Sequence, residues 1–127
     1  MSYSVKPSED GKYIILKHYG EIDRALTTQR NQEAHALGAK LGISRHLVDL
    51  TEARHVDTVM NTYEFAYEDM QFLPRINKNA RVAVLVSQDD HSHDFVETVT
   101  RNAGQNVTLF RDREAAIQHL LKDYENT

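Results

Sequence analysis

Apolar and polar residues alternate over short stretches at the start of the chain. Residues 3–7 (YSVKP) and 12–21 (KYIILKHYGE) each match a short strand. The Asp10-Gly11 pair lies between them and is typical of a hairpin turn, because glycine tolerates a positive φ. The sequence therefore predicts an antiparallel β-hairpin at the N-terminus.

Helical and extended patterns alternate after the hairpin. Residues 24–42 carry apolar residues three and four positions apart, with Asp23 placed to cap a helix and Gly42 placed to end it. Further strands are predicted at 45–50, 81–87 and 106–110, and further helices at about 58–73, 92–103 and 112–126. Strands that alternate with helices are joined by crossovers, so the last four strands should run parallel.

These elements predict an α/β fold: a single domain over residues 1–127, with a mixed sheet of about five strands and about four helices. The first strand is antiparallel in its hairpin and the rest are parallel. Residues 45–50 (RHLVDL) and 81–87 (RVAVLVS) are apolar on both faces of the pleat, as buried parallel strands are. Right-handed crossovers between sequential strands put the helices on one face. The other face then needs cover, from self-association or from one helix that crosses over.

Composition excludes several classes of protein. The chain has 127 residues, of which 40% are hydrophobic and 27% charged, as in an ordinary globular domain. Its net charge is −4 with mixed signs, so no basic stripe favours nucleic acid. Cysteine is absent, which excludes disulfides and thiolate sites. No apolar run approaches the roughly 20 residues of a membrane span, and a cytoplasmic location is expected.

A polar stretch, SQDDHSHDFVE at residues 87–97, raises the question of a metal or acid–base site. It follows an apolar strand and precedes an amphipathic helix, where Ser and Asp satisfy free N–H groups. His91 and His93 are two positions apart and would diverge on a helix, which makes them weak metal ligands. We interpret the stretch as a helix entrance and expect no cofactor.

The other histidines are predicted to be structural. His18 alternates with Ile14 and Leu16, so a hydrogen-bonded core histidine is expected there. Four more occur singly and are interpreted as surface or satisfied residues: His35, His46, His55 and His119. No nucleophile elbow, P-loop or dinucleotide motif occurs, and the sequence indicates no enzyme.

The helix at 58–73 carries more aromatic residues than one buried face needs. Phe65 and Phe72 lie seven residues apart, off the stripe formed by Met60, Tyr63, Tyr67 and Met70. If that stripe faces the sheet, the two phenylalanines face a neighbouring element or a partner, with Arg75 close by to pair with an acidic group. The alternative is that neighbouring helices bury both stripes.

Four segments in order resemble the SpoIIAA-like, STAS-related family of small bacterial domains. They are YGEID (19–23), HLVDLTEA (46–53), NKNARVAVLVSQDD (77–90) and NVTLFRDREAAIQHLL (106–121). The resemblance covers nearly the whole chain and implies successive β-α turns with a mixed sheet whose first strand is antiparallel. Related domains act as phosphorylation-gated binding modules, and many have no assigned role.

The resemblance also implies a candidate phospho-acceptor, Thr58. In anti-sigma-factor antagonists an Asp-Ser-Ser-Gly context carries the modified serine, and Asp57-Thr58 lies at about the matching place. Val59 and Met60 replace the second hydroxyl and the glycine of that context. A phosphate there would meet a helix N-terminus but also the like charge of Asp57. The alternative is that Thr58 is only an N-cap.

Two functions are therefore weighed. The favoured one is a non-enzymatic module that binds an unidentified protein partner or a second copy as a homodimer, gated at Thr58. The second is a small-molecule or lipid-binding domain, or a weak enzyme, with an apolar pocket near the strand C-termini. Four polar residues would line that pocket: Asp49, Thr51, Ser87 and Asp89.

Overall fold

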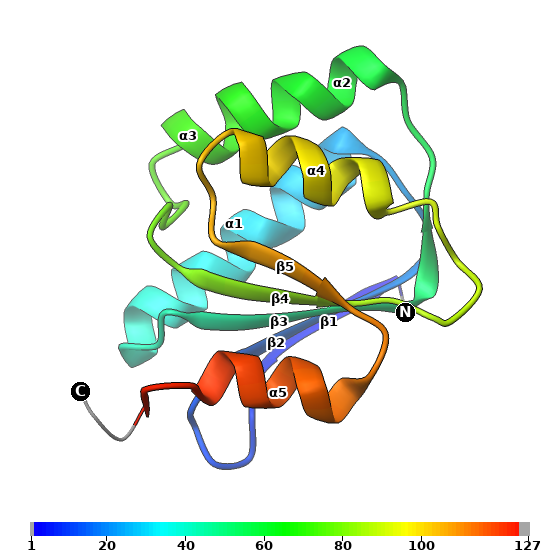
Figure 1. Cartoon of the computed structure of the whole chain (residues 1–127). Coiled ribbons are helices and arrows are strands. Elements are labelled where there is room, and N and C mark those ends of the chain that lie inside the picture. The colour runs from blue at the N-terminus through cyan, green and yellow to red at the C-terminus, as the bar shows by residue number, and fades with distance from the viewer. Residues whose placement is uncertain (1, 125–127) are drawn as a thin grey trace.

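The computed structural model describes residues 2–124, and these form a single five-stranded sheet (Figure 1). The strands lie in sequence order: β1 (Tyr3–Pro7), β2 (Ile14–Ile22), β3 (Arg45–His55), β4 (Arg81–Leu85) and β5 (Val107–Phe110). β1 pairs antiparallel with β2, and every later neighbour is parallel. The predicted mixed α/β sheet is confirmed.

The helices begin where the sequence places their caps. The helical segments are α1 (Arg24–Leu41), α2 (Val59–Glu64), the π-helical turn η1 (Phe65–Asp69), α3 (Met70–Phe72), α4 (Asp94–Asn102) and α5 (Arg113–Leu121). Asp23, Thr58 and Asp112 each accept a hydrogen bond from the backbone N–H three residues later. The last helix ends earlier than predicted, and residues 125 and 126 of that prediction lie outside the described residues.

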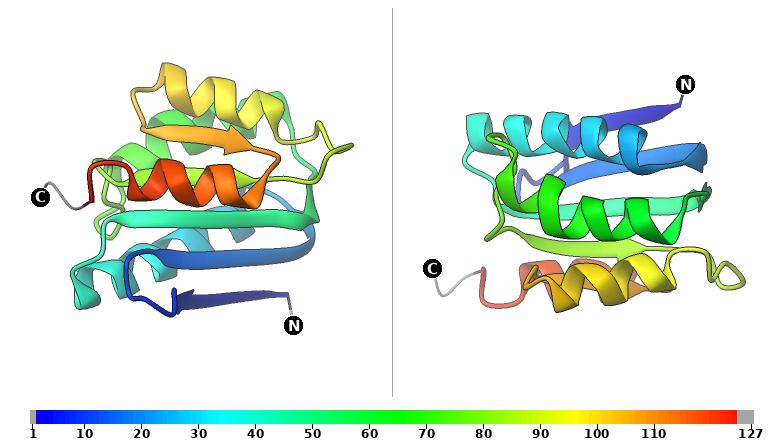
Figure 2. Two further views of the ribbon diagram at one scale, coloured as in Figure 1. Left: turned by 60° about the horizontal axis from the view of Figure 1, so that its bottom comes forward. Right: turned by 90° about the horizontal axis from the view of Figure 1, so that it is seen from above.

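The helices form two unequal layers. α1, the α2–η1–α3 segment and α4 cover one face of the sheet, and α5 alone lies on the other (Figures 1 and 2). Right-handed crossovers between sequential strands place the first three connections on one face. After β5 the chain passes to the opposite face, so α5 covers β3, β4 and β5 there. One helix that crosses over is therefore the way this molecule covers its second face.

The two faces of the sheet bury different sets of side chains from the same strands. The α5 face holds one apolar cluster: Tyr13, Leu47, Ala83, Leu85, Ala116 and Leu120. The opposite face holds two smaller clusters, around Ile14, Leu16 and Ala34 and around Ile22, Leu50, Ala53 and Val86. Adjacent residues such as Leu47 and Val48 point to opposite faces because side chains alternate along a strand.

The α2–η1–α3 segment turns a different side to the sheet from the one predicted. Phe65 and Met70 are buried, whereas Phe72 is 80% exposed. Phe65 and Phe72 do not share a face because the N–H of Met70 bonds the carbonyl of Phe65 five residues earlier, and this π-type turn holds an extra residue. Three members of the predicted inward stripe also lie at the surface: Met60, Tyr63 and Tyr67. The burial of both stripes is therefore wrong, and the exposure of the two phenylalanines is correct for Phe72 and wrong for Phe65.

The first turn of α4 gives a second correction. The apolar pattern of the helix expected at 92–103 predicts that Phe95, Val96 and Val99 point inward, and Val99 is indeed buried. Phe95 instead lies at the surface, edge-on to the ring of Tyr63 at 5.9 Å between centroids. The inward face of α4 therefore starts one residue later and continues through Thr100.

Candidate functional site

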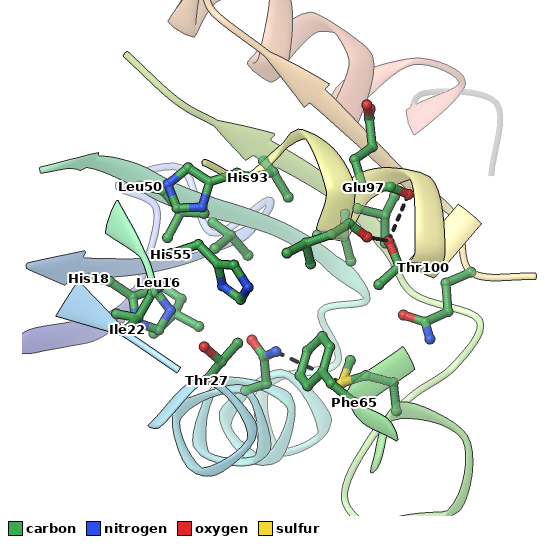
Figure 3. Close-up of a pocket in the computed structure, with 18 of the residues that line it drawn as sticks. Leu16, His18, Ile22, Thr27, Leu50, His55, Phe65, His93, Glu97 and Thr100 are labelled. Carbon is green, nitrogen blue, oxygen red and sulfur yellow. Dashed lines mark hydrogen bonds between the residues drawn. The ribbon is translucent and has the colours of Figure 1, made fainter. Parts of the chain in front are cut away.

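A cavity of about 100 Å³ lies between the sheet and its three-helix layer (Figure 3). Its floor consists of inward-facing side chains from β2 to β5, and its roof of side chains from α1, α2, η1, α3 and α4. Most of the wall surface is apolar, with aliphatic side chains such as Leu16, Val48 and Val84, and Phe65 closes one side. The burial of Phe65 follows from the π-turn, so the cavity depends on a feature that the sequence pattern did not reveal.

Five of the seven histidines of the chain line this cavity. They come from β2, α1, β3 and the start of α4: His18, His35, His46, His55 and His93. His35 and His55 each have a hydrogen-bond partner, as predicted for satisfied residues, whereas His46 and His119 each keep a buried ring nitrogen without one among the described residues. His18 and His46 occupy inward positions of neighbouring strands, which strand alternation alone could have shown. His35 joins them only through the packing of α1.

His35 and His46 form a stacked pair. Their ring centroids are 4.4 Å apart, and the N–H of Asn77 donates to Nδ1 of His35 at 2.9 Å. Gly38 makes room for His46, since a Cβ there would lie 3.3 Å from its Cε1 atom and 2.6 Å from the carbonyl oxygen of Ile43. Burial lowers the pKa of His35 to about 4 and, with His35 nearby, that of His46 to about 3. Both rings are neutral at pH 7.

His18 is a buried ring at the other side of the cavity. Arg30 donates from a guanidinium nitrogen to Nδ1 of His18 at 3.1 Å. Burial and the neighbouring Arg30 charge lower the pKa of His18 to about 4, so this ring is also neutral. The predicted hydrogen-bonded core histidine is confirmed at Nδ1, but Nε2 is buried without a partner among the described residues.

His55 and His93 complete the set, with ring centroids 6.3 Å apart. Nε2 of His93 lies 3.2 Å from the carbonyl oxygen of Ala53 and 3.3 Å from a carboxylate oxygen of Asp90. Burial lowers the pKa of both rings. His91, the other weak metal candidate, points away to the surface. Within residues 2–124, no three His, Asp or Glu side chains converge in a way that could hold a metal ion.

An ion-pair network joins two parts of the cavity roof, α1 and the α2–η1 segment. Arg24 at the start of α1 binds both carboxylate oxygens of Asp69, at 2.7 and 2.9 Å, and Glu64 at 2.6 Å. Thr28 adds a hydrogen bond to Asp69 at 3.0 Å. A two-pronged arginine–carboxylate contact fixes orientation as well as distance. The network therefore holds the η1 turn, and with it Phe65, against α1.

The polar residues predicted to line a pocket at the strand ends lie elsewhere. Asp49 faces α5, where its carboxylate accepts hydrogen bonds from the Thr51 hydroxyl at 2.7 Å and from Arg113 at 2.8 Å. Burial acts to raise the pKa of Asp49, but these hydrogen bonds outweigh it and hold the pKa below its ordinary value. Ser87 and Asp89 follow β4. None of the four lines the cavity.

Two other predicted residues are at the surface. Thr58 is exposed, caps α2 and accepts from the N–H of Asn61 at 3.1 Å, so its predicted role as an N-cap is confirmed. Asp57 beside it accepts from the backbone N–H of Arg24 at 2.6 Å and so joins the two helix starts. Arg75 is exposed and lines an open polar groove between α1 and the α2–α3 segment. Phosphorylation of Thr58 stays a prediction.

Comparison with known proteins identifies the fold. No family model matches the chain, and no curated protein sequence matches it. A solved structure of an uncharacterized protein from the DUF3478 family, with a SpoIIAA-like fold and from Shewanella loihica PV-4, is similar in structure. It is 20% identical, with a TM-score of 0.52, over 93% of this chain and 91% of that chain. The fold is therefore SpoIIAA-like. Within residues 2–124, no helix has the length and apolar character needed to cross a membrane.

Proposed function

We propose that this SpoIIAA-like domain is a non-enzymatic binding module whose histidine-lined cavity takes a small, largely apolar molecule. The observation that supports it is the cavity of about 100 Å³ between the sheet and the helices. A cavity of about 150 Å³ lined by aliphatic side chains accepts benzene, so this one suits a molecule of about that size or smaller. The pocket differs in place from the one expected at the strand ends.

The polar atoms in the wall distinguish a binding site from a packing defect. Four buried side-chain atoms of the described residues have no hydrogen-bond partner, and three of them belong to residues that line the cavity: Nε2 of His18, Oγ1 of Thr27 and Nδ1 of His46. A native interior leaves few polar groups unsatisfied, because each one costs free energy. Their gathering around one empty space favours a ligand that satisfies them.

The histidines favour binding over catalysis. A general base works best when its pKa lies near the operating pH. The pKa values of His18, His35 and His46, at about 3 to 4, make these rings weak bases at neutral pH. The expected behaviour is ligand retention without turnover.

The cavity is tested with benzene as the probe and amide chemical shifts as the readout. Val84 lies on its floor, so Val84→Phe should fill the space and abolish the shifts that benzene causes in the native protein. Val59→Phe adds the same bulk at an exposed position of α2 and serves as the matched control. Shifts that persist in a folded Val84→Phe protein, or that cluster away from the cavity, contradict the proposal.

A second function is favoured by a surface feature. Exposed apolar side chains gather on the outside of α2, η1, α3 and α4, and we call them the outer aromatic surface: Met60, Tyr63, Tyr67, Phe72 and Phe95. Tyr63 stacks on Tyr67 and meets Phe95 edge-on, and groups of exposed apolar side chains of this kind mark interaction sites. We propose that a protein partner binds there, and a second copy of the chain is the first partner to test.

Sedimentation velocity over a range of concentrations tests self-association at this surface. Dimers should form in the native protein and disappear in Tyr67→Ser/Phe72→Ser, since both changes remove exposed apolar area. Leu41→Ser, at an exposed position on α1, is the control and should leave the dimer intact. A native protein that stays monomeric throughout contradicts self-association. Thr58 lies at the start of the same helix, so Thr58→Glu is expected to weaken the dimer if phosphorylation gates this surface.

A further inference from the structure

One end of the cavity carries an unsatisfied hydrogen-bond donor whose identity the structure determines. The guanidinium of Arg30 can only donate, so Nδ1 of His18, 3.1 Å away, must be the accepting nitrogen. A neutral imidazole then carries its proton on the other nitrogen. Nε2–H of His18 is therefore a donor, and it is fully buried with no partner in residues 2–124.

Thr27 on α1 supplies a second unsatisfied group. A threonine within a helix commonly bonds the carbonyl four residues earlier. Thr62, Thr98 and Thr100 do so in this molecule, at 3.1, 3.2 and 2.9 Å. The hydroxyl of Thr27 makes no such bond and is buried, and Thr27 is one of the residues that line the cavity. Thr28 bonds Asp69 instead, so among the helical threonines of the described residues Thr27 is the exception, with a hydroxyl that has no partner.

The two groups belong to the same end of the cavity. Thr27 lies three residues before Arg30, and side chains at this spacing are neighbours on a helix. Arg30 contacts His18, so α1 brings Thr27 toward His18 as well. Figure 3 shows His18 and Thr27 on one side of the cavity, opposite Glu97 and Thr100.

Arg30 adds a positive charge at this end of the cavity, and its surroundings do not neutralise that charge. Arg30 is buried, and no carboxylate of the described residues lies within 4.0 Å of its guanidinium. Its guanidinium instead lies 4.7 Å from the ring centroid of Tyr3. A donor polarised by a nearby cation attracts a partner with a lone pair and negative charge density.

We infer that the ligand of this cavity carries an oxygen atom that accepts a hydrogen bond from Nε2–H of His18 and also bonds the hydroxyl of Thr27. The inference rests on the proposed binding function and deepens it. The ligand class is a small branched or short-chain molecule with an apolar body and one acceptor oxygen, from a carbonyl or a carboxylate group. The aliphatic walls hold the body, and the His18–Thr27 end orients the oxygen.

Three probes of nearly equal shape separate these possibilities. They are 2,3-dimethylbutane, 3-methyl-2-butanone and isobutyrate, which present a hydrocarbon, a neutral oxygen and an ionised oxygen. Dissociation constants come from NMR titration of the native protein and of Thr27→Val, which removes the hydroxyl but keeps the shape. Thr100→Val is the matched control, because Thr100 lines the opposite end and its hydroxyl is already bonded.

We expect Thr27→Val to weaken binding of the better oxygen probe about tenfold relative to the hydrocarbon, while Thr100→Val leaves that ratio within about twofold. Thr27→Val should also raise the melting temperature of the ligand-free protein, since it removes an unsatisfied buried hydroxyl. In the native protein the same oxygen probe should shift the ring Nε2–H signal of His18, and the hydrocarbon should not. The tighter of the two oxygen probes identifies the charge of the ligand.

The possible outcomes distinguish a failure of the proposed oxygen contact from a failure of the proposed binding function. If the hydrocarbon and oxygen probes bind but the ratio is unchanged in Thr27→Val and the His18 signal does not move, the oxygen contact is refuted and the cavity remains a binding site. If no probe binds the native protein, the binding function fails and the inference fails with it.

Discussion

Neighbouring residues of the same strands point to opposite faces of the sheet, and the two faces have different roles. Toward α5, Leu47, Ala83 and Leu85 pack against Ala116 and Leu120 in one closed apolar cluster. Toward the other helices, the alternate residues of those strands surround a cavity with histidines in its wall. The α5 face of the sheet thus forms a packed core, and the opposite face encloses a cavity.

Residue size and polarity explain the difference. Ala83 and Ala116 are fully buried and small, so α5 approaches the sheet closely. On the other face, buried histidines on β2, β3 and α1 keep polar rings where aliphatic side chains would interdigitate. Dense packing stabilises a fold, whereas space with unsatisfied polar atoms lowers stability and is retained where a ligand occupies it.

Lowering the pH should reduce the free energy of unfolding through the buried histidines of the cavity face, and this is the largest effect expected. The pKa values of His18, His35 and His46 are about 4, 4 and 3 in the folded protein, below the ordinary value of 6.5. Between pH 6.5 and 4 the unfolded chain binds protons that the folded chain does not. The free energy of unfolding should therefore fall as pH falls, by about 1.4 kcal/mol per pH unit for each such histidine. Urea denaturation at pH 7, 6 and 5 measures it.

Single variants test whether the cavity histidines cause this dependence of the free energy of unfolding on pH. In His46→Gln the slope between pH 6 and 5 should be shallower than in the native protein by about 1.4 kcal/mol per pH unit. His91→Gln, at an exposed position, should keep the native slope. A native free energy of unfolding that is level across this range would show that the buried rings are not neutral.

The packed face should be the more sensitive of the two to a loss of volume. Leu120 is fully buried against the sheet, so Leu120→Ala should lower the free energy of unfolding by about 3 kcal/mol, within the usual range of about 2 to 5. Urea denaturation at pH 7 measures the change. Leu41→Ala on α1 is the control, with an expected loss below about 1 kcal/mol because Leu41 is exposed. Similar losses at the two sites would contradict a packed α5 face.

Adjacent residues of β4 allow the two faces to be compared with added volume. Ala83→Val enlarges a side chain in the packed cluster and should cost about 1 to 3 kcal/mol. Val84→Ile adds one methylene at the cavity floor and should stabilise by up to about 0.8 kcal/mol. Thermal and urea unfolding should give opposite signs for the two variants. Equal destabilisation would mean that the cavity has no room for a methylene group.

The outer aromatic surface should matter least for folding. Phe72→Ser removes a side chain that is 80% exposed, so the free energy of unfolding should change by less than about 0.5 kcal/mol. Phe65→Ser, seven residues earlier and buried at the cavity, is the comparison and should cost several times more. A large loss in Phe72→Ser would place that ring in the core.

Local signals in the sequence were reliable where neighbours along the chain decide the structure. Asp23, Thr58 and Asp112 cap helices because each side chain meets an N–H only three residues away. The hairpin turn and the parallel order of the later strands also follow from short segments and crossover handedness. Each of these rules involves few residues at a time, so the structure that follows from them can be predicted from the sequence pattern.

The candidate site was less predictable because it depends on a local irregularity and on contacts between distant elements. The π-turn moved Phe65 inward and left Phe72 outside, and a regular helical period cannot show this. Asp49 and Thr51 were expected at a strand end, but β3 continues to His55, so both lie in the middle of the strand, and strand alternation directs them to the α5 face.

The sequence by itself determined the order of strands and helices and where most helices begin, since these depend on spacing along one chain, and its resemblance to the SpoIIAA-like family implied the class of fold. Only the tertiary structure decided that α5 crosses to the second face and that five histidines from four segments surround one space. Side chains such as His18 and Arg30 meet only after α1 folds onto β2, and the partners they find there set their protonation and their unsatisfied atoms. A binding site formed by contacts between distant elements can be identified only in the folded structure.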